Sequence, residues 1–286
     1  MKEFYLNGAF VAPEQAMISV MDRGFLFGDG VYEVIPAYAG KPLREFEHLQ
    51  RLQNSLQGIG LAPPLSPSDW SLIFQRLLSA TPAVDQALYL QVTRGVAPSR
   101  DHRFPSAPVP TVLAMAKPMK PRDPAVAERG VEAVIRDDIR WLRCDIKATA
   151  LLAAVLLRQS AEEAGAEEAI LVRDGLALEG STSNLFIVRQ GRLITPPKGP
   201  LLLAGITRDL VLELAAAAEL PSEERDIRVE ELRTADEVWI SSSTREVLPV
   251  TRLDGAPIGS GRPGPSWQRI DRCYQDFKAD LGRAAA

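Results

Sequence analysis

Lys147 is the residue whose type and position most directly indicate covalent chemistry. It ends the segment Trp-Leu-Arg-Cys-Asp-Ile-Lys (141–147), which we expect to be extended, and it precedes a helix expected from about Thr149 to Ala164. In so apolar a setting a lysine can lose its charge by desolvation and become nucleophilic near neutral pH. For this residue taken alone, a solvated lysine that caps the helix is the alternative.

Three motifs downstream of the lysine and one loop upstream contain groups that bind anions or share protons. They are Glu-Gly-Ser-Thr-Ser-Asn-Leu-Phe (179–186), Gly-Ile-Thr-Arg (205–208), Ser-Ser-Ser-Thr-Arg-Glu (241–246) and Pro-Ser-Arg-Asp-His-Arg-Phe-Pro (98–105). Together with Lys147 they resemble the fold type IV pyridoxal-phosphate enzymes, and the D-amino acid transaminases most closely. The resemblance covers nearly the whole chain and is densest at residues 22–34, 92–105, 136–152 and 179–186.

This resemblance implies roles for the lysine and for a glutamate. Lys147 would form the Schiff base with pyridoxal 5'-phosphate and move the proton between the substrate and the cofactor. Glu179 would face the pyridine nitrogen, where a carboxylate keeps the ring protonated and able to accept electrons. Without the matching motif, a glutamate before Gly-Ser is more simply a turn residue.

Arg51 is the first of three groups expected to hold the cofactor phosphate. It lies on a helix predicted over residues 46–59, and its guanidinium group offers a charge-assisted fork to an anion. The sequence contains no Gly-x-x-x-x-Gly-Lys-Ser/Thr run of the kind that binds nucleotides. Gly28-Asp29-Gly30 is not a dinucleotide fingerprint either, and we expect it to be a backbone turn.

The other two groups that are expected to hold the phosphate are a helix start and a serine-rich turn. Ile206 and Thr207 open a helix after Gly205, where free backbone N–H groups and the helix dipole favour an anion. Ser242 and Ser243 belong to a hydroxyl-rich turn that follows a predicted strand. In relatives the matching groups hold the phosphate, whereas Gly-Ile-Thr-Arg alone would be an ordinary helix cap.

The loop at residues 98–105 resembles the D-amino acid transaminase loop that binds the substrate α-carboxylate. The matching positions are Arg100 and His102, with Tyr32 from a strand. Arginine supplies a planar fork for a carboxylate, and histidine adds a second donor. In relatives this loop reaches the partner subunit's site, which implies a homodimer. A solvated basic loop is the alternative, and Arg103 leaves open which arginine points inward.

Several further residues are expected to have supporting roles around the cofactor. Leu203 is expected to pack on a cofactor face, as its counterpart does in relatives. Thr182 and Ser183 would donate hydrogen bonds at the cofactor's side, and Glu33 would lie behind the residues that touch it. For each of these residues a purely structural role is the alternative. His48 is expected to be a helix-packing residue.

Composition limits the classes of function. The chain has 286 residues and a formal charge of −4, with acidic and basic residues interspersed, so we expect no nucleic-acid partner. No apolar run reaches membrane-spanning length, and the N-terminus turns polar too early for a signal peptide. Cys144 and Cys273 are expected to be buried free thiols, and no metal site is expected from the His and Cys spacing. We therefore expect a cytoplasmic, metal-free protein.

The order of elements indicates an α+β (irregular α/β) fold, because strands and helices do not alternate as in a Rossmann sheet. A first domain is expected over residues 1–116, a linker over 117–124, and a second domain over 125–286 that carries the lysine. The resemblance places the cofactor between the two domains. Strands are expected at 4–6, 9–11, 31–39, 88–93, 111–116, 131–135, 141–146, 169–172, 184–188 and 237–241, and helices at 46–59, 69–80, 149–164, 208–218 and 267–281.

The expected activity is ping-pong transamination between D-amino acids and 2-oxo acids, such as D-alanine with pyruvate and D-glutamate with 2-oxoglutarate. Branched-chain L-aminotransferases, aminodeoxychorismate lyases and R-selective amine transaminases share the fold and are alternatives. A protein that binds the cofactor or a metabolite without turnover is an alternative from another class. Arg245, where many D-transaminases have a small residue, leaves the substrate range open.

Overall fold

A tight hairpin opens the chain in the computed structural model, which describes residues 2–81 and 84–283. Asn7 and Gly8 have φ angles of 48° and 93° and join β1 (Phe4–Leu6) to β2 (Ala9–Val11). Positive φ at both central residues is what a two-residue hairpin turn requires. The hairpin expected at Asn-Gly is therefore confirmed.

The chain divides into two units. The first comprises Met1–Pro121, Ile146–Leu151 and Leu281–Ala286, and the second comprises Arg122–Asp145 and Leu152–Asp280. Residues 1, 82–83 and 284–286, which include the outer ends of both expected domains, lie outside the described residues.

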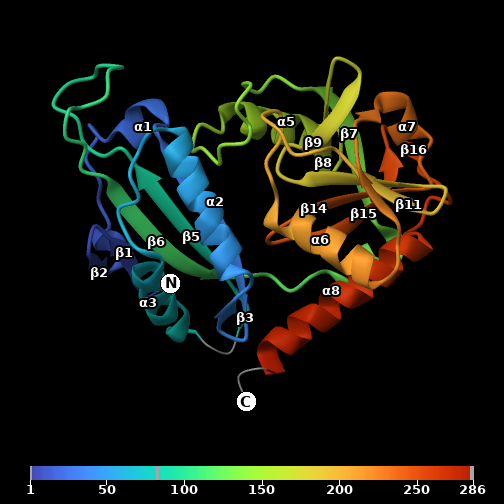
Figure 1. The fold of residues 1–286 in the computed structure, drawn as a ribbon, viewed down its shortest axis with the longest axis horizontal. Helices are drawn as coiled ribbons and strands as arrows, with labels where there is room; N and C mark the ends of the chain where they lie inside the picture. Colours follow the sequence, from blue (N-terminus) through green and yellow to red (C-terminus); the bar gives the residue numbers. More distant parts are fainter. Residues whose placement is uncertain (1, 82–83, 284–286) are drawn as a thin grey trace. The chain divides into compact units, whose positions relative to one another are not determined.

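The first unit is built on a six-stranded antiparallel sheet in the order β2-β1-β6-β5-β3-β4. Its remaining strands are β3 (Gly30–Tyr38), β4 (Lys41–Pro42), β5 (Gln86–Thr93) and β6 (Thr111–Pro118). Helices α2 (Glu45–Gly58) and α3 (Pro67–Ser79) contact this sheet (Figure 1), and α1 (Arg23–Phe27) and a short 3-10 helix (Pro13–Gln15) precede β3.

Sequence periodicity explains how these helices pack. Leu49, Leu52 and Leu56 recur at helical spacing on α2 and are buried, and Trp70 and Phe74 do the same on α3. Ser66 and Asp69 form a capping box that fixes the start of α3. Both helices were predicted from this spacing and are confirmed, with bounds that differ by one or two residues.

The second unit contains a ten-stranded mixed sheet. Its main path runs β12-β11-β10-β14-β15-β7-β8-β9-β13, and β16 pairs with β15. A further pairing of Asn184 with Glu179 joins β10 to β9, so six of the strands form a closed ring. The strands are β7 (Val131–Asp137), β8 (Glu168–Arg173), β9 (Leu176–Gly180), β10 (Asn184–Arg189), β11 (Arg192–Thr195), β12 (Ser222–Glu224), β13 (Ile227–Arg228), β14 (Glu237–Ser242), β15 (Glu246–Leu253) and β16 (Ala256–Pro257).

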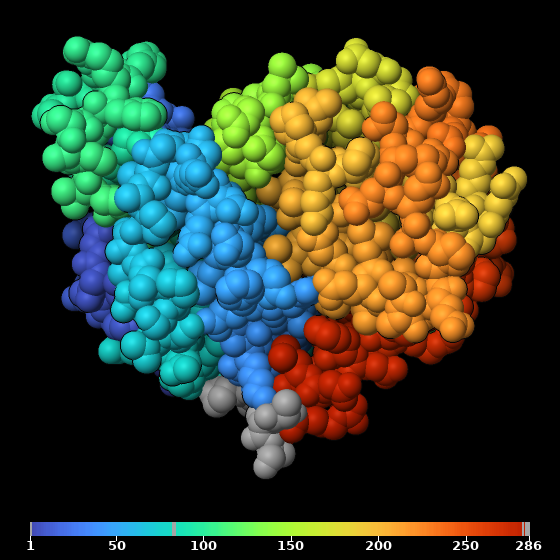
Figure 2. All heavy atoms as spheres, in the orientation of Figure 1, coloured from blue at the N-terminus to red at the C-terminus, as the bar shows by residue number. Residues whose placement is uncertain are grey.

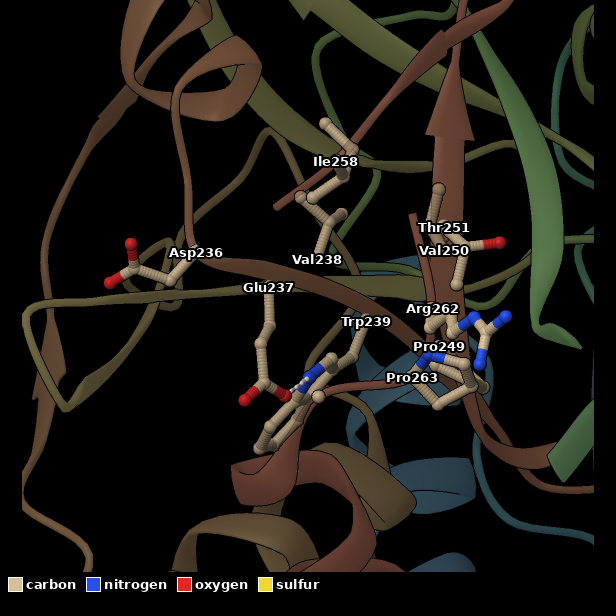
Figure 3. A pocket seen from close by; sticks show the side chains of 11 residues that line it. Asp236, Glu237, Val238, Trp239, Pro249, Val250, Thr251, Ile258, Arg262 and Pro263 are labelled. Carbon is tan, nitrogen blue, oxygen red and sulfur yellow. Dashed lines mark hydrogen bonds between the residues drawn. The ribbon is translucent and has the colours of Figure 1, made fainter. Parts of the chain in front are cut away.

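Helices of the second unit contact these strands. They are α4 (Pro124–Arg129), α5 (Leu152–Glu163), α6 (Ile206–Ala217), α7 (Val229–Arg233) and α8 (Pro265–Arg283). The buried carboxylate of Glu237 accepts the Ser266 and Trp267 backbone N–H groups at 2.9 Å each and so caps the start of α8. Glu237 and Trp239, hydrogen-bonded to each other, line the pocket in Figure 3, which contains none of the predicted site residues.

One expectation on the fold needs correction, and the expected domain boundaries stay a prediction. The strand expected at 141–146 is wrong, because these residues form turns and bends, and Trp141 and Leu142 are exposed rather than packed in a sheet. The expected domain boundaries, 1–116, 117–124 and 125–286, differ from the two units. Ile146–Leu151 groups with the first unit, and β6 extends into the expected linker as far as Pro118.

No helix among the described residues is both long enough and apolar enough to cross a membrane.

Candidate active site

Lys147 lies in the irregular segment that packs on the first unit. Its carbonyl accepts the Tyr32 backbone N–H at 3.0 Å, and its own N–H donates to the Ser55 hydroxyl at 3.2 Å. The segment is thereby tied to β3 and α2. The Lys147 side chain is half-buried, and its Nζ lies 4.3 Å from the centroid of the Tyr32 ring. The structure therefore brings together two of the predicted site residues.

Arg51 belongs to a buried charged cluster between α2 and β3. Its Nε and Nη2 donate to the two oxygens of Glu33 at 2.7 and 2.9 Å, and His48 Nδ1 lies 2.8 Å from the same carboxylate. Burial alone would raise the pKa of Glu33, but the Arg51 charge and the hydrogen bonds hold that pKa far below its ordinary value. Glu33 orients Arg51, and a contact of Arg51 with phosphate stays a prediction.

His48 does more than pack the helix. Its ring is buried, and burial lowers its pKa despite the opposing effect of the hydrogen bond with Glu33. This pairing was not foreseen from the sequence, because His48 and Glu33 lie on different elements.

Arg100 and His102 gather around one aromatic ring of α1. The Arg100 guanidinium carbon lies 5.0 Å from the Phe27 ring centroid, and the His102 ring lies 5.2 Å from it. Both side chains are exposed on the loop between β5 and β6, which is the green group of atoms at the edge of the first unit in Figure 2. Among the described residues, no hydrogen bond or ring contact joins either one to Tyr32.

Arg103 has a different environment from Arg100. Its guanidinium group pairs with Asp101 at 2.6 Å, and its side chain is 89% exposed. Of the two arginines, Arg100 is therefore the one that shares the Phe27 ring with His102.

Glu179 is the penultimate residue of β9, where the closure of the strand ring places it beside Asn184. The carboxylate accepts the Asn184 amide at 3.2 Å, the Leu203 backbone N–H at 3.2 Å, and a hydrogen bond from Arg140. Burial raises the pKa of Glu179 to about 7, although the Arg140 charge opposes this rise. A carboxylate with such a pKa shares a proton readily near neutral pH, as a partner of a pyridine nitrogen must.

The start of α6 has the features of an anion site. Gly205 is its N-cap, and a Cβ there would lie 1.8 Å from the Asn184 side-chain oxygen, so any other residue would displace the Asn184 side chain. No side chain among the described residues caps this start, which leaves the first-turn amides around Ile206 and Thr207 to bind an anion. The residues present fit a phosphate group. The helix begins at Ile206, as the Gly-Ile-Thr-Arg motif predicted, and two residues before the approximate bound of Arg208.

The serine-rich turn is linked to the 181–183 turn by Arg245. Arg245 Nε lies 3.4 Å from the Ser242 hydroxyl, and its Nη2 donates to Thr182 at 2.8 Å and to Glu168. Ser243 follows directly after β14 and is half-buried.

Glu168 is the centre of this network. Its fully buried carboxylate accepts the hydroxyls of Thr182 and Ser183 at 2.9 Å each, as well as that of Ser181. The Thr182 and Ser183 hydroxyls thus have partners inside the protein. A role for Thr182 at the cofactor's side stays a prediction.

The predicted residues thus form one group in each unit. Lys147, Tyr32, Arg51, Arg100 and His102 lie in the first unit, and Glu179, Thr182, Leu203, Ile206, Thr207, Ser242 and Ser243 lie in the second. Sequence reasoning missed Arg140 and Glu168, because ionic partners far apart in the chain leave no local pattern. Both expected free thiols have no disulfide partner; Cys144 is buried, whereas Cys273 is only half-buried. Among the described residues no cluster of metal-ligating side chains is found.

Comparison with known proteins assigns the family. Residues 30–253 match the model of "Amino-transferase class IV". The chain is 42% identical to a D-alanine aminotransferase of Bacillus licheniformis over 94% of this chain and 95% of that protein. It resembles the Escherichia coli branched-chain amino acid aminotransferase with a TM-score of 0.90 and 27% identity, covering 96% of this chain and 94% of that one. The PLP-bound form of a hypothetical aminotransferase from Mycobacterium tuberculosis matches with a TM-score of 0.82 and 25% identity, covering 96% and 99%.

The chain therefore belongs to the class IV aminotransferases, which have the fold type IV architecture and depend on pyridoxal 5'-phosphate. The expected α+β fold, the family and the cofactor are confirmed.

Proposed function

We propose that this aminotransferase transfers the amino group of D-amino acids, such as D-alanine and D-glutamate, to 2-oxo acids such as pyruvate and 2-oxoglutarate. The observation that carries the proposal is that Arg100 and His102 both lie about 5 Å from the Phe27 ring centroid (5.0 and 5.2 Å), in a chain 42% identical to a D-alanine aminotransferase over almost its full length. An arginine and a histidine on one loop can together bind the α-carboxylate that amino acids have and simple amines lack.

Different residues of the chain are proposed to have different roles in transamination. Pyridoxal phosphate supplies an aldehyde that takes the substrate amine and a ring that draws electrons from the substrate carbon. Lys147 is proposed to be the nucleophilic amine and to move the proton at the substrate Cα. Glu179 is proposed to hold the proton at the pyridine nitrogen, and its pKa of about 7 supports this role.

Binding of the cofactor phosphate is assigned to groups from three segments. Arg51 supplies charge, the Ile206 and Thr207 amides supply donors at a helix start, and the Ser242 and Ser243 hydroxyls complete the set. Leu203, whose backbone N–H contacts Glu179, is proposed to pack on a face of the ring, with Thr182 at its side, and Tyr32 to assist Arg100 and His102.

We propose that the protein acts as a homodimer in the cytoplasm. Leu152, Val155 and Leu156 share one face of α5 and are 73%, 59% and 54% exposed, and Trp141 and Leu142 of the same unit are exposed as well. Exposed apolar residues gathered on one helix face are typical of a protein interface, and a second copy of the chain is the partner that the family resemblance indicates.

A substrate panel tests the proposed activity. D- and L-amino acids and R- and S-amines are each assayed with pyruvate and with 2-oxoglutarate. Turnover of D-alanine and D-glutamate supports the proposal. Preferential turnover of L-leucine or of R-amines would replace it with the branched-chain or amine-transaminase alternative, and the solved branched-chain enzyme with the same fold makes the former the main competitor. A protein that binds the cofactor but converts none of these compounds would indicate the non-catalytic alternative.

Mixing two defective variants tests the dimer. If the 98–105 loop reaches the partner's site, a heterodimer of Arg100→Ala and Lys147→Ala protomers holds one site with both changes and one intact site. Activity should then return from two weak or inactive parents. No recovery, when subunit exchange is demonstrated by mass spectrometry, would mean that each site is formed by one chain.

A further inference from the structure

The segment Asp22–Gly30 forms a small folded motif rather than a simple turn. Asp22 caps the start of α1 by accepting the Gly24 N–H at 2.7 Å, and Gly28 ends the helix with a φ of 67°. Arg23, the first residue of this short helix, faces Asp29, which follows the helix, because Arg23 Nε donates to Asp29 at 2.8 Å. The backbone turn expected at Gly28-Asp29-Gly30 is present, and its central side chain has a further role.

Asp29 pairs with two buried arginines at once. Arg94 Nε and Nη2 donate to its carboxylate at 2.8 and 3.0 Å, in addition to the bond from Arg23. The Arg23 and Arg94 side chains are only 4% and 2% exposed. Burial alone would raise the pKa of Asp29, but the hydrogen bonds from Arg94 and Arg23 hold that pKa below its ordinary value. The carboxylate therefore stays ionised and fixes both guanidinium groups.

The remaining donors of Arg23 bind the main chain of the loop at residues 98–105, which is the predicted substrate-binding loop. Its Nη1 donates to the carbonyls of Asp101 and Arg103 at 2.5 and 3.3 Å, and its Nη2 donates to the carbonyl of His102 at 3.3 Å. One buried side chain thus contacts three consecutive residues of an exposed loop, 78 to 80 positions away in the sequence.

Arg94 holds the next part of the same loop. Its guanidinium carbon lies 3.6 Å from the centroid of the Phe104 ring, and its Nη2 is fixed by the Ile59 carbonyl at 2.7 Å. The loop is therefore held at residues 101–104, immediately after Arg100, and the Phe27 ring of α1 contacts Arg100 and His102.

We propose that Arg23, Asp29 and Arg94 form a clamp that holds the substrate-binding loop in the conformation in which Arg100 and His102 bind the α-carboxylate. All three are positioning residues, because Arg23 contacts the loop main chain, Arg94 contacts the Phe104 ring, and Asp29 acts through these two arginines. The effect on substrate binding rests on the proposed function, whereas the effect on the loop does not. A loop that is ordered before binding loses less conformational entropy when the substrate binds.

Arg23→Lys in the holoenzyme tests the clamp with little change in charge. A single ammonium group cannot reach Asp29 and three carbonyls together. Hydrogen exchange of the peptide covering residues 98–105 should become about tenfold faster or more, because one lost charge-assisted hydrogen bond corresponds to about that factor. Exchange in α2 and α3 should stay unchanged.

Arg76→Lys is the matched control. Arg76 is in the same unit and forms two hydrogen bonds with Glu3 at 2.8 Å each. Its guanidinium carbon lies 3.7 Å from the Phe10 ring centroid, and none of these contacts is with residues 98–105. Its substitution should leave exchange at 98–105 unchanged. If Arg23→Lys does not fold, Arg94→Lys replaces it, since that change removes the support of Phe104 and keeps the Arg23 contacts.

Kinetics separates the clamp from the proposed function. Arg23→Lys should raise KM for D-alanine by about tenfold while kcat changes much less. The substrate would have to order the loop when it binds, and the free energy of that ordering weakens substrate binding. Faster loop exchange with an unchanged KM would confirm the clamp and reject the carboxylate-binding role of the loop. Unchanged loop exchange in Arg23→Lys, or an equal increase in Arg76→Lys, would overturn the clamp.

Discussion

Glu33→Gln is the change that most directly tests how charge fixes α2 on the first sheet. The Glu33 side chain is fully buried and accepts two hydrogen bonds from Arg51, with His48 as a third neighbour. An amide offers one acceptor oxygen and no charge, so the variant removes the counter-charge that Glu33 supplies to Arg51. Removing one partner of a buried ion pair costs about 3–5 kcal/mol. Because the amide keeps one hydrogen bond, we expect the free energy of unfolding at pH 7 to fall by about 3 kcal/mol.

The pH dependence of this loss has a definite sign. The pKa of Glu33 lies far below its ordinary value of 4.5 in the folded protein, so the folded state favours the ionised form. The stabilisation is therefore fully present above pH 4.5 and is lost as the pH falls towards the folded-state pKa. The difference between the wild type and Glu33→Gln should be constant from pH 8 to about pH 5 and should shrink below pH 4.5.

Urea unfolding of the apo-protein, followed by tryptophan fluorescence, measures this difference without a contribution from bound cofactor. Glu3→Gln is the control, because Glu3 pairs with Arg76, which is 55% exposed. A pair of that kind contributes at most about 1 kcal/mol. A Glu33→Gln loss no larger than the Glu3→Gln loss, or a loss equal at pH 4 and pH 7, would refute the ionised buried pair.

Three further predictions concern the candidate active site. Lys147→Ala should keep the fold but lower turnover by many orders of magnitude, as steady-state and single-turnover assays would show; measurable turnover at near wild-type rate would remove the lysine from the mechanism. Glu179→Gln should still bind pyridoxal phosphate, measured by its absorbance, but should slow the first half-reaction, since an amide cannot stabilise a protonated pyridine nitrogen; an unchanged rate would place Glu179 outside the chemistry. Arg100→Ala should lower kcat/KM for D-alanine by about one to two decades and leave simple amines nearly unaffected, and equal losses for both would show that Arg100 does not bind the carboxylate.

Local signals in the sequence predicted much of the fold. The Asn7-Gly8 hairpin and the α2 and α3 helices follow from turn chemistry and from apolar spacing, which act over a few residues. β15 was missed because Pro249 lies inside its apolar run, and proline normally argues against a central strand. The strand expected at 141–146 was wrong because these residues form turns and bends, in which Trp141 and Leu142 are exposed while Cys144 and Ile146 are buried without sheet pairing.

The candidate site was also predicted only in part from the sequence. Residues in contiguous motifs, such as Glu179 and the start of α6 at Ile206, were identified from the sequence, because a motif keeps its order and spacing. The side chains that contact these residues were not identified from the sequence. Arg140 reaches Glu179 across 39 positions, and Arg23 reaches the substrate loop across about 80, so only the folded chain reveals these contacts.

The central claim is that the enzyme acts on the D-enantiomer, and a single half-reaction tests it most directly. The purified holoenzyme is mixed with D-alanine, L-alanine or L-leucine in the absence of any 2-oxo acid, and the loss of the cofactor's visible absorbance is followed by stopped flow. We predict that D-alanine removes the band at least about 100-fold faster than either L-amino acid, with the product recovered as pyruvate. A faster reaction with L-leucine or L-alanine than with D-alanine would contradict the assignment.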